Sequence, residues 1–159
     1  EVPVERAHAS TAWPKAQFTE EMRDKEISFS PEAAREMDVL MRAVEEILTL
    51  TFRAFHENDA QLASRVEPLE QVIDTLKEEL RTRHILRMTK GECSAEAGFV
   101  WSDLLTSLER TADHCSNVAG CVMDIARHQL SLHDTLRREK NGDGDFDAQY
   151  DAYAAEFSL

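Results

Sequence analysis

Residues 101–126 read WSDLLTSLERTADHCSNVAGCVMDIA, and this stretch is the clearest guide to the fold. Its apolar side chains recur at steps of three and four residues, which gathers them on one face of an α-helix. They are Trp101, Leu104, Leu105, Leu108, Ala112, Cys115, Val118, Ala119, Val122, Ile125 and Ala126. The pattern predicts a long amphipathic helix that begins after an N-cap at Ser94 and runs to about His133.

Two earlier segments carry the same period. A helix is predicted at 31–57 behind the cap Ser30-Pro31, and another at 59–88, closed by Gly91. The first stripe holds Met37, Leu40, Met41, Val44, Ile47, Leu48, Thr51, Phe52 and Phe55, and the second holds Leu62, Val66, Leu69, Ile73, Leu76, Leu80 and Ile85. The short link Asn58-Asp59 requires antiparallel neighbours. Pro68 lacks a backbone donor, so we expect a kink near 64–68 within one continuous helix.

The two ends of the chain show weaker patterns. Residues 1–29 mix prolines and polar residues, which predicts an arm or linker with a short helical piece at 18–22. Residues 141–147 are typical of a solvated acidic turn, and 147–157 of a short closing helix whose aromatic residues pack back. The predicted fold is all-α: an antiparallel three-helix bundle over 30–159, with short extra helical segments at both ends.

The composition excludes several functions. The 159 residues carry 31 Asp and Glu against 18 Lys and Arg, a net charge of −13, so we expect no nucleic-acid partner and no attraction to acidic lipid. No apolar stretch approaches the roughly 18 residues that span a bilayer, so we expect no membrane insertion by this segment. Five Gly and four Pro argue against a turn-rich β fold, and three cysteines indicate a reducing, intracellular compartment.

Two copies of one acidic motif stand beside the apolar stripes. Glu70 and Asp74 form an ExxxD pair on the second helix, and Glu109 and Asp113 form another on the third; Asn117 extends the latter row by one turn. A spacing of four residues places each pair on one helix face, and four carboxylates on neighbouring helices suit Mg, Mn, Fe or Zn. The alternative is a solvated acidic face whose charges pair locally, with Lys77 near Asp74 and Arg110 near Asp113.

Other reactive residue types have ordinary explanations. His114 points away from Asp113, and His84 lies among Arg81, Arg83 and Arg87, a basic patch that suits either a helix C-terminus or an anion. Cys115 lies on the apolar stripe and is interpreted as inert core. The alternating oxygens at 141–147 lack the Gly and Glu of a calcium loop. With no nucleophile, phosphate-loop or zinc motif, we expect no enzyme.

The third helix also carries a family resemblance. Leu108-Glu-Arg-Thr-Ala-Asp-His-Cys-Ser-Asn117 resembles the ERxxDHxxN signature of the PhoU family of phosphate-uptake regulators. Further similarity lies in 66–74, in Arg83-His-Ile85 and in Lys90-Gly-Glu-Cys93. Over about 29–159 the chain resembles the last PhoU-like repeat in the cytoplasmic region of bacterial sodium/phosphate-cotransporter-type proteins, where a membrane transporter domain precedes tandem three-helix repeats.

The resemblance implies a regulatory role in phosphate transport, at the cytoplasmic side of a membrane to which the whole protein is tethered. It implies that Glu70, Asp74, Glu109 and Asp113, with Asn117 on the same row, can bind iron, zinc or another divalent metal, with phosphate as a candidate ligand. It also implies self-association, or docking to a preceding PhoU-like repeat and a transporter domain, because a lone half exposes the face that meets its twin.

Two other functions compete with this one. The alternative is a free-standing PhoU-type signalling protein that contacts partners without metal. A di-metal enzyme fits least, because di-iron carboxylate bundles use Glu-x-x-His pairs that neither ExxxD motif provides.

Overall fold

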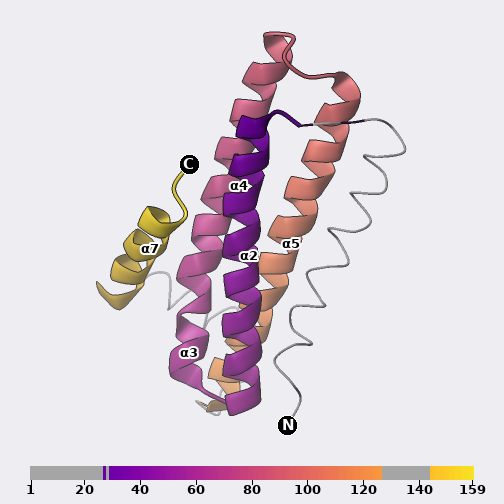
Figure 1. The fold of residues 1–159 in the computed structure, drawn as a ribbon. Helices are drawn as coiled ribbons and strands as arrows, with labels where there is room; N and C mark the ends of the chain where they lie inside the picture. The colour runs from indigo at the N-terminus through magenta and orange to yellow at the C-terminus, as the bar shows by residue number, and fades with distance from the viewer. Residues whose placement is uncertain (1–26, 28, 127–143) are drawn as a thin grey trace.

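The computed structural model describes residue 27, residues 29–126 and residues 144–159 of the chain (Figure 1). Three long helices run antiparallel: α2 (Pro31–Glu57), α4 (Val66–Thr89) and α5 (Ala95–Ala126). The short α3 (Ala60–Ser64) precedes α4, and α7 (Gly144–Glu156) packs on the outer side of α4. All elements in the described residues are helical, which confirms the predicted all-α bundle.

The first helix boundaries follow the predicted local signals. Ser30 Oγ accepts a hydrogen bond from the Ala33 amide at 3.1 Å, and Pro31 occupies the first turn. Asn58 ends α2 in the left-handed conformation, with φ at 50°. Asp59 Oδ1 then accepts hydrogen bonds from the Gln61 and Leu62 amides, which starts α3 at once and turns the chain back along α2.

The second predicted helix is interrupted at Arg65, which corrects the expectation of one continuous helix. Arg65 is both the C-cap of α3 and the N-cap of α4. Pro68 follows three residues later; it has no amide to donate, and its ring crowds the Ser64 carbonyl. The helix therefore breaks within the segment where a kink was predicted.

The core lies between α2, α4 and α5. Its largest fully buried side chains are Trp101, Leu40, Ile47, Leu69, Ile73, Leu80, Met123 and Val66, together with Pro68. All of these except Met123 and Pro68 belong to a predicted apolar stripe. Burying a Leu or Ile side chain stabilises the fold by about 1.5–3 kcal/mol, so these contacts account for most of the packing between the helices.

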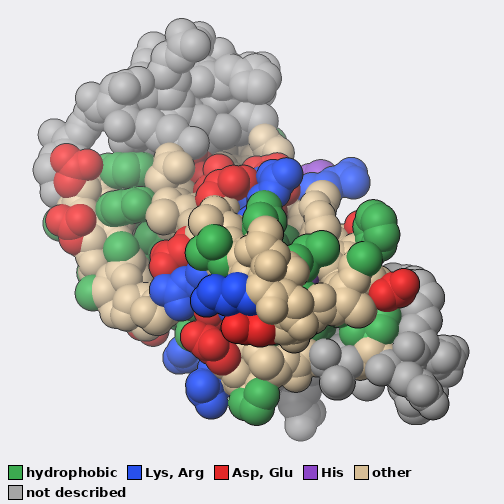
Figure 2. All heavy atoms as spheres, turned by 90° about the horizontal axis from the view of Figure 1, so that it is seen from above, with side chains coloured by type: hydrophobic (Ala, Val, Ile, Leu, Met, Phe, Trp, Pro, Cys, Tyr) green, Lys and Arg blue, Asp and Glu red, His purple; other side chains and the backbone are tan. Residues whose placement is uncertain are grey.

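Several predicted core residues are exposed instead. Phe52, Phe55, Ile85, Val118, Ile125 and Ala126 face outward. On α2 the buried positions continue through Leu50 and Ala54, and on α4 they continue through His84 and Arg87. Selecting residues for hydrophobicity therefore favours the wrong neighbour where a small or polar residue occupies the buried position. Figure 2, which looks down on the α4–α5 turn, shows hydrophobic side chains interspersed with charged ones.

The closing helix begins earlier than predicted. Residues 144–147, expected in the acidic turn, form the first turn of α7, where Asp147 suits the positive end of the helix dipole. Tyr153 and Phe157 are buried, and Arg65 Nη2 donates to Tyr153 Oη at 3.3 Å. The expectations for the arm, the 18–22 piece, the extension to His133 and residues 141–143 lie outside the described residues.

Within those residues, no helix combines the length and apolar character that a bilayer span requires.

Candidate functional site

The two ExxxD motifs meet across the α4–α5 contact at one lysine. Lys77 Nζ, on α4, lies 2.8 Å from Glu109 Oε1 on α5 and 4.0 Å from Asp74 Oδ1 on its own helix. The Lys77 and Glu109 side chains are only 19% and 22% exposed, so this bridge is partly shielded from solvent. The structure therefore brings Asp74 and Glu109 within reach of a single cation, as the predicted adjacency of the two helices required.

The other three predicted ligands lie along the same rows at different depths. Glu70, one turn before Asp74, is buried with 9% of its surface exposed. Asp113 and Asn117, one and two turns beyond Glu109, are exposed on α5. In the part of the chain that the structure describes, no three His, Cys, Asp or Glu side chains are grouped as metal ligands would be. The five-residue metal site stays a prediction.

Lys77 supplies the positive charge that the paired carboxylates need. Its hydrogen bond to Glu109 raises the pKa of the Lys77 ammonium, the charges of Glu109, Asp74 and Glu78 add to this effect, and burial opposes it. The predicted local pairing with Asp74 is present at 4.0 Å, and the shorter bridge to Glu109 joins the helices. A divalent metal fits this place only if it displaces the ammonium; Asp74 and Glu109 would then hold it.

A second carboxylate contact lies on the same faces and was not predicted. Glu67, 2% exposed, accepts a short hydrogen bond from Ser116 Oγ across the α4–α5 interface. Glu67 precedes Glu70 by three residues, so it shares the helix face of the ExxxD pair. That spacing is the sequence signal by which it could have been found.

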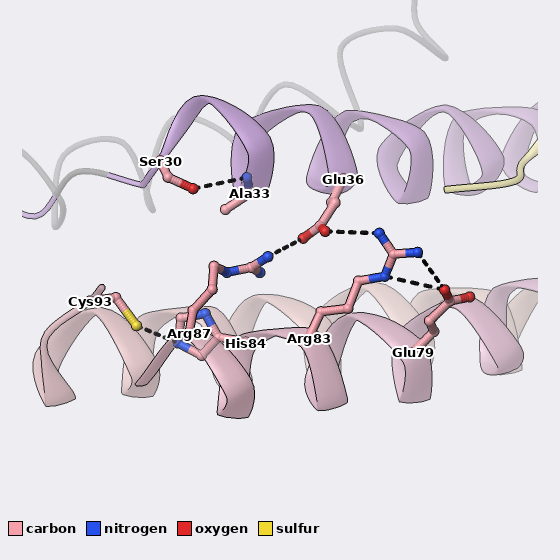
Figure 3. Close-up of polar contacts among 8 residues, drawn as sticks. All are labelled: Ser30, Ala33, Glu36, Glu79, Arg83, His84, Arg87 and Cys93. Carbon is pink, nitrogen blue, oxygen red and sulfur yellow. Dashed lines mark hydrogen bonds and ion pairs between the residues drawn. The ribbon is translucent and has the colours of Figure 1, made fainter. Parts of the chain in front are cut away.

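The basic patch of α4 is built around a buried carboxylate of α2 (Figure 3). Glu36 receives Arg87 Nη1 at 2.7 Å on one oxygen and Arg83 Nη1 at 3.1 Å on the other. The Glu36 and Arg87 side chains are 5% and 9% exposed. Arg83 also binds Glu79 at 2.6 Å. Two arginines thus converge on one carboxylate, and this pairing replaces the predicted choice between a helix C-terminus and an anion.

Aromatic rings complete this end of the bundle. The His84 ring stacks on Trp101 with centroids 5.1 Å apart, Phe29 meets the indole edge to face, and Arg87 lies over the same indole. Burial, followed by the nearby Arg87 charge, lowers the pKa of His84, with Glu36 opposing. The lowered pKa favours the uncharged form of the imidazole, which suits its buried position.

The other two side chains singled out in the sequence, Cys115 and His114, lie apart from this site. Cys115 is buried, which confirms its predicted place in the core, and burial raises the pKa of its thiol. His114 is exposed on α5. Neither residue joins Lys77 and the carboxylates.

The fold is an antiparallel helical bundle with acidic motifs paired across two of its helices, and comparison with known proteins identifies its family. Residues 38–122 match the PhoU domain, and the chain belongs to the PhoU family. It is 27% identical over 121 residues to the phosphate-specific transport system accessory protein PhoU homolog 1 of Thermotoga maritima, covering 76% of this chain and 51% of that protein. The chain thus spans about half the length of this curated relative. No solved structure gives a significant match.

Proposed function

We propose that this PhoU domain regulates phosphate transport as a non-catalytic module on the cytoplasmic side of a sodium/phosphate-cotransporter-type membrane protein. The observation that carries the proposal is the meeting of both ExxxD motifs at Lys77, within the segment that matches the PhoU domain. The relative's name, a phosphate-specific transport accessory protein, supports the link to phosphate. The residues around Pro68, Arg83 and Lys90 that resemble transporter-attached members support the link to a cotransporter.

The Lys77–Glu109 bridge offers a way to couple a bound ligand to helix packing. Within the described residues, this ion pair joins α4 to α5 beside the acidic rows. A ligand that draws either side chain away changes the balance between packed and loosened arrangements of the two helices, in proportion to its preference for one of them. Iron, zinc or another divalent metal, when bound, would supply positive charge and free coordination positions for phosphate.

A metal-free signalling protein is the second candidate, and Lys77 favours it. Because the ammonium already compensates Asp74 and Glu109, these residues need no metal to remain together. The two candidates differ in what the gene encodes upstream of Glu1. Apolar segments of roughly 20 residues there support the transporter, and a start codon close to Glu1 supports the free-standing regulator.

Phosphate uptake by cells that express the whole gene tests the regulatory role. We expect Glu109→Ala combined with Asp113→Ala to change how uptake responds to external phosphate. The matched control is Glu46→Ala with Asp103→Ala, two exposed acidic residues outside the motifs. Equal phosphate responses in the wild type and the motif variant, at equal protein levels, would contradict the proposal.

The metal content of the purified protein tests the predicted metal ligands of the ExxxD motifs separately. The wild type is expected to retain iron or zinc after purification, and the Glu109→Ala, Asp113→Ala variant to lose it. Lys77→Met removes the competing ammonium and should raise retention. Equal metal content in the wild type and the double variant would exclude the row as a metal site and leave the metal-free candidate.

A further inference from the structure

Three soft or borderline ligand atoms lie near the end of α4, away from the ExxxD rows. They belong to His84 and Met88, four residues apart on α4, and to Cys93 in the turn that follows. Cys93 Sγ lies 3.8 Å from His84 Nε2 (Figure 3). A Cβ atom added to Gly98 would lie 2.9 Å from Met88 Sδ and 3.5 Å from the same His84 nitrogen. Met88 Sδ and His84 Nε2 therefore both lie beside Gly98 on α5, where there is no side chain.

The local structure fixes the cysteine and histidine in these positions. Gly91, with φ at 73°, ends α4; its amide donates to the Met88 carbonyl at 3.0 Å and the Glu92 amide donates to the Arg87 carbonyl at 2.9 Å. This is the Schellman arrangement, which folds the chain back over the last turn of the helix. Cys93 follows immediately and thus faces His84. Stacking on Trp101 fixes the imidazole plane.

The distances suit two ligands of one metal ion. Bonds of about 2.3 Å to sulfur and about 2.0 Å to nitrogen, at angles near 110–120°, hold the two ligand atoms about 3.5–3.8 Å apart. The observed separation of 3.8 Å needs little movement. Cys93 is half-buried and Met88 is 38% exposed, so an ion can enter from solvent.

The ligand types select the metal. Thiolate and thioether sulfur are soft ligands that favour monovalent copper, and imidazole is compatible with it. Arg87 lies over the same Trp101 ring on which His84 stacks, so its positive charge disfavours an additional divalent charge, whereas monovalent copper and a Cys93 thiolate together are neutral. We propose that His84, Cys93 and Met88 form a binding site for monovalent copper at the α4–α5 turn. Binding forms a sulfur–copper bond and releases the thiol proton to solvent.

Titration of the reduced whole chain with monovalent copper, without oxygen and against a chromogenic copper chelator, tests the site. We expect one ion to bind per chain. Cys93→Ser should weaken binding by at least about 100-fold and Met88→Leu by at least about 10-fold, because losing a ligand costs no less than the roughly 10–100-fold that losing an outer-shell partner costs. Both side chains are partly exposed, and circular dichroism shows whether each variant keeps its helices.

Matched controls separate this site from the rest of the molecule. Cys121→Ser removes an exposed cysteine from α5 and should leave the copper affinity unchanged. Glu109→Ala with Asp113→Ala should also leave it unchanged, because the ExxxD rows take no part. Undiminished affinity in Cys93→Ser, a loss of affinity in Cys121→Ser, or no copper withheld from the chelator by the wild type would each overturn the proposal.

Discussion

Glu36 shows how one buried carboxylate organises an end of the bundle. Its two oxygens receive Arg87 and Arg83, and the Arg87 guanidinium is held between this ion pair and the Trp101 ring. Arg83 is 34% exposed and can turn to solvent, whereas Arg87 is 9% exposed and cannot. The stability of this end therefore depends on Glu36 more than on either arginine.

Replacing Glu36 by Gln is expected to destabilise the fold by about 3 kcal/mol, because it leaves the Arg87 charge buried without a partner. Urea unfolding measures the change as a lower midpoint with an unaltered slope. Glu79→Gln serves as the control, since Glu79 is 47% exposed and pairs within one helix face. Its cost should stay below about 0.5 kcal/mol. Equal shifts in the two variants would show that Glu36 is no more important than a surface carboxylate.

The three cysteines are expected to react with a thiol reagent in the order of their exposure. Cys121 is exposed, Cys93 is half-buried and Cys115 is buried, with the pKa of its thiol raised by burial. Because the thiolate is the reactive form, Cys115 should stay unmodified at pH 8 until denaturant is added. Mass spectrometry of the labelled peptides reports each site. Early labelling of Cys115 would contradict its place in the core.

At the scale of the element, the buried face of α4 changes from apolar to polar residues along the helix. The buried positions run through Ile73, Leu76 and Leu80 and then continue through His84 and Arg87. Ile85, the residue that hydrophobicity alone selects, is 52% exposed. The helix keeps its period while the chemistry of its buried face changes from apolar to paired and stacked.

Truncation of two isoleucines on α4 tests this register. Ile73→Ala removes a fully buried side chain and should cost about 2–5 kcal/mol. Ile85→Ala, the same substitution three turns later, should cost less than about 1 kcal/mol, because the side chain is half exposed. Thermal unfolding of both variants gives the comparison. Equal losses of stability in the two variants would indicate that Ile85 is buried, as the apolar stripe predicts, and would contradict the burial of His84.

The helices could be predicted from the sequence because their signals are local. Ser30-Pro31, Asn58-Asp59 and Gly91 each satisfy or end a backbone pattern within a few residues. The break at Arg65 was less accessible, since Pro68 predicts a disturbed helix but not whether its two parts remain continuous.

The candidate site was predictable only in part, for a different reason. The repeated ExxxD spacing places Asp74 and Glu109 on facing helices, but the partner that Lys77 chooses depends on the distance between those helices. Likewise, Glu36 lies beside Met37 in the apolar period, and nothing near it in sequence indicates that Arg83 and Arg87 will meet it. Contacts between distant residues require the packed structure.

At the scale of the whole molecule, the three-helix unit leaves large apolar side chains uncovered at both ends. Phe52 and Phe55 on α2 are 49% and 65% exposed, at the end of the bundle where α5 carries Ile125, which is 58% exposed. Phe99, at the opposite end, is 75% exposed. Since the chain spans about half of its curated relative, a second PhoU-like unit is the partner we propose for the Phe52 end.

Sedimentation of the isolated chain tests this proposal. In the absence of another PhoU-like unit, a second copy of the chain can cover the Phe52 end. We expect the apparent mass to rise with protein concentration, as burial of exposed aromatic rings favours association. Phe52→Ser combined with Phe55→Ser should shift the chain toward the monomer, since each polar replacement removes apolar area from the proposed contact. Phe99→Ser makes the same change at the other end and should leave the association intact. A wild type that remains monomeric at high concentration would exclude self-association, and dissociation by Phe99→Ser alone would place the contact at the α4–α5 turn.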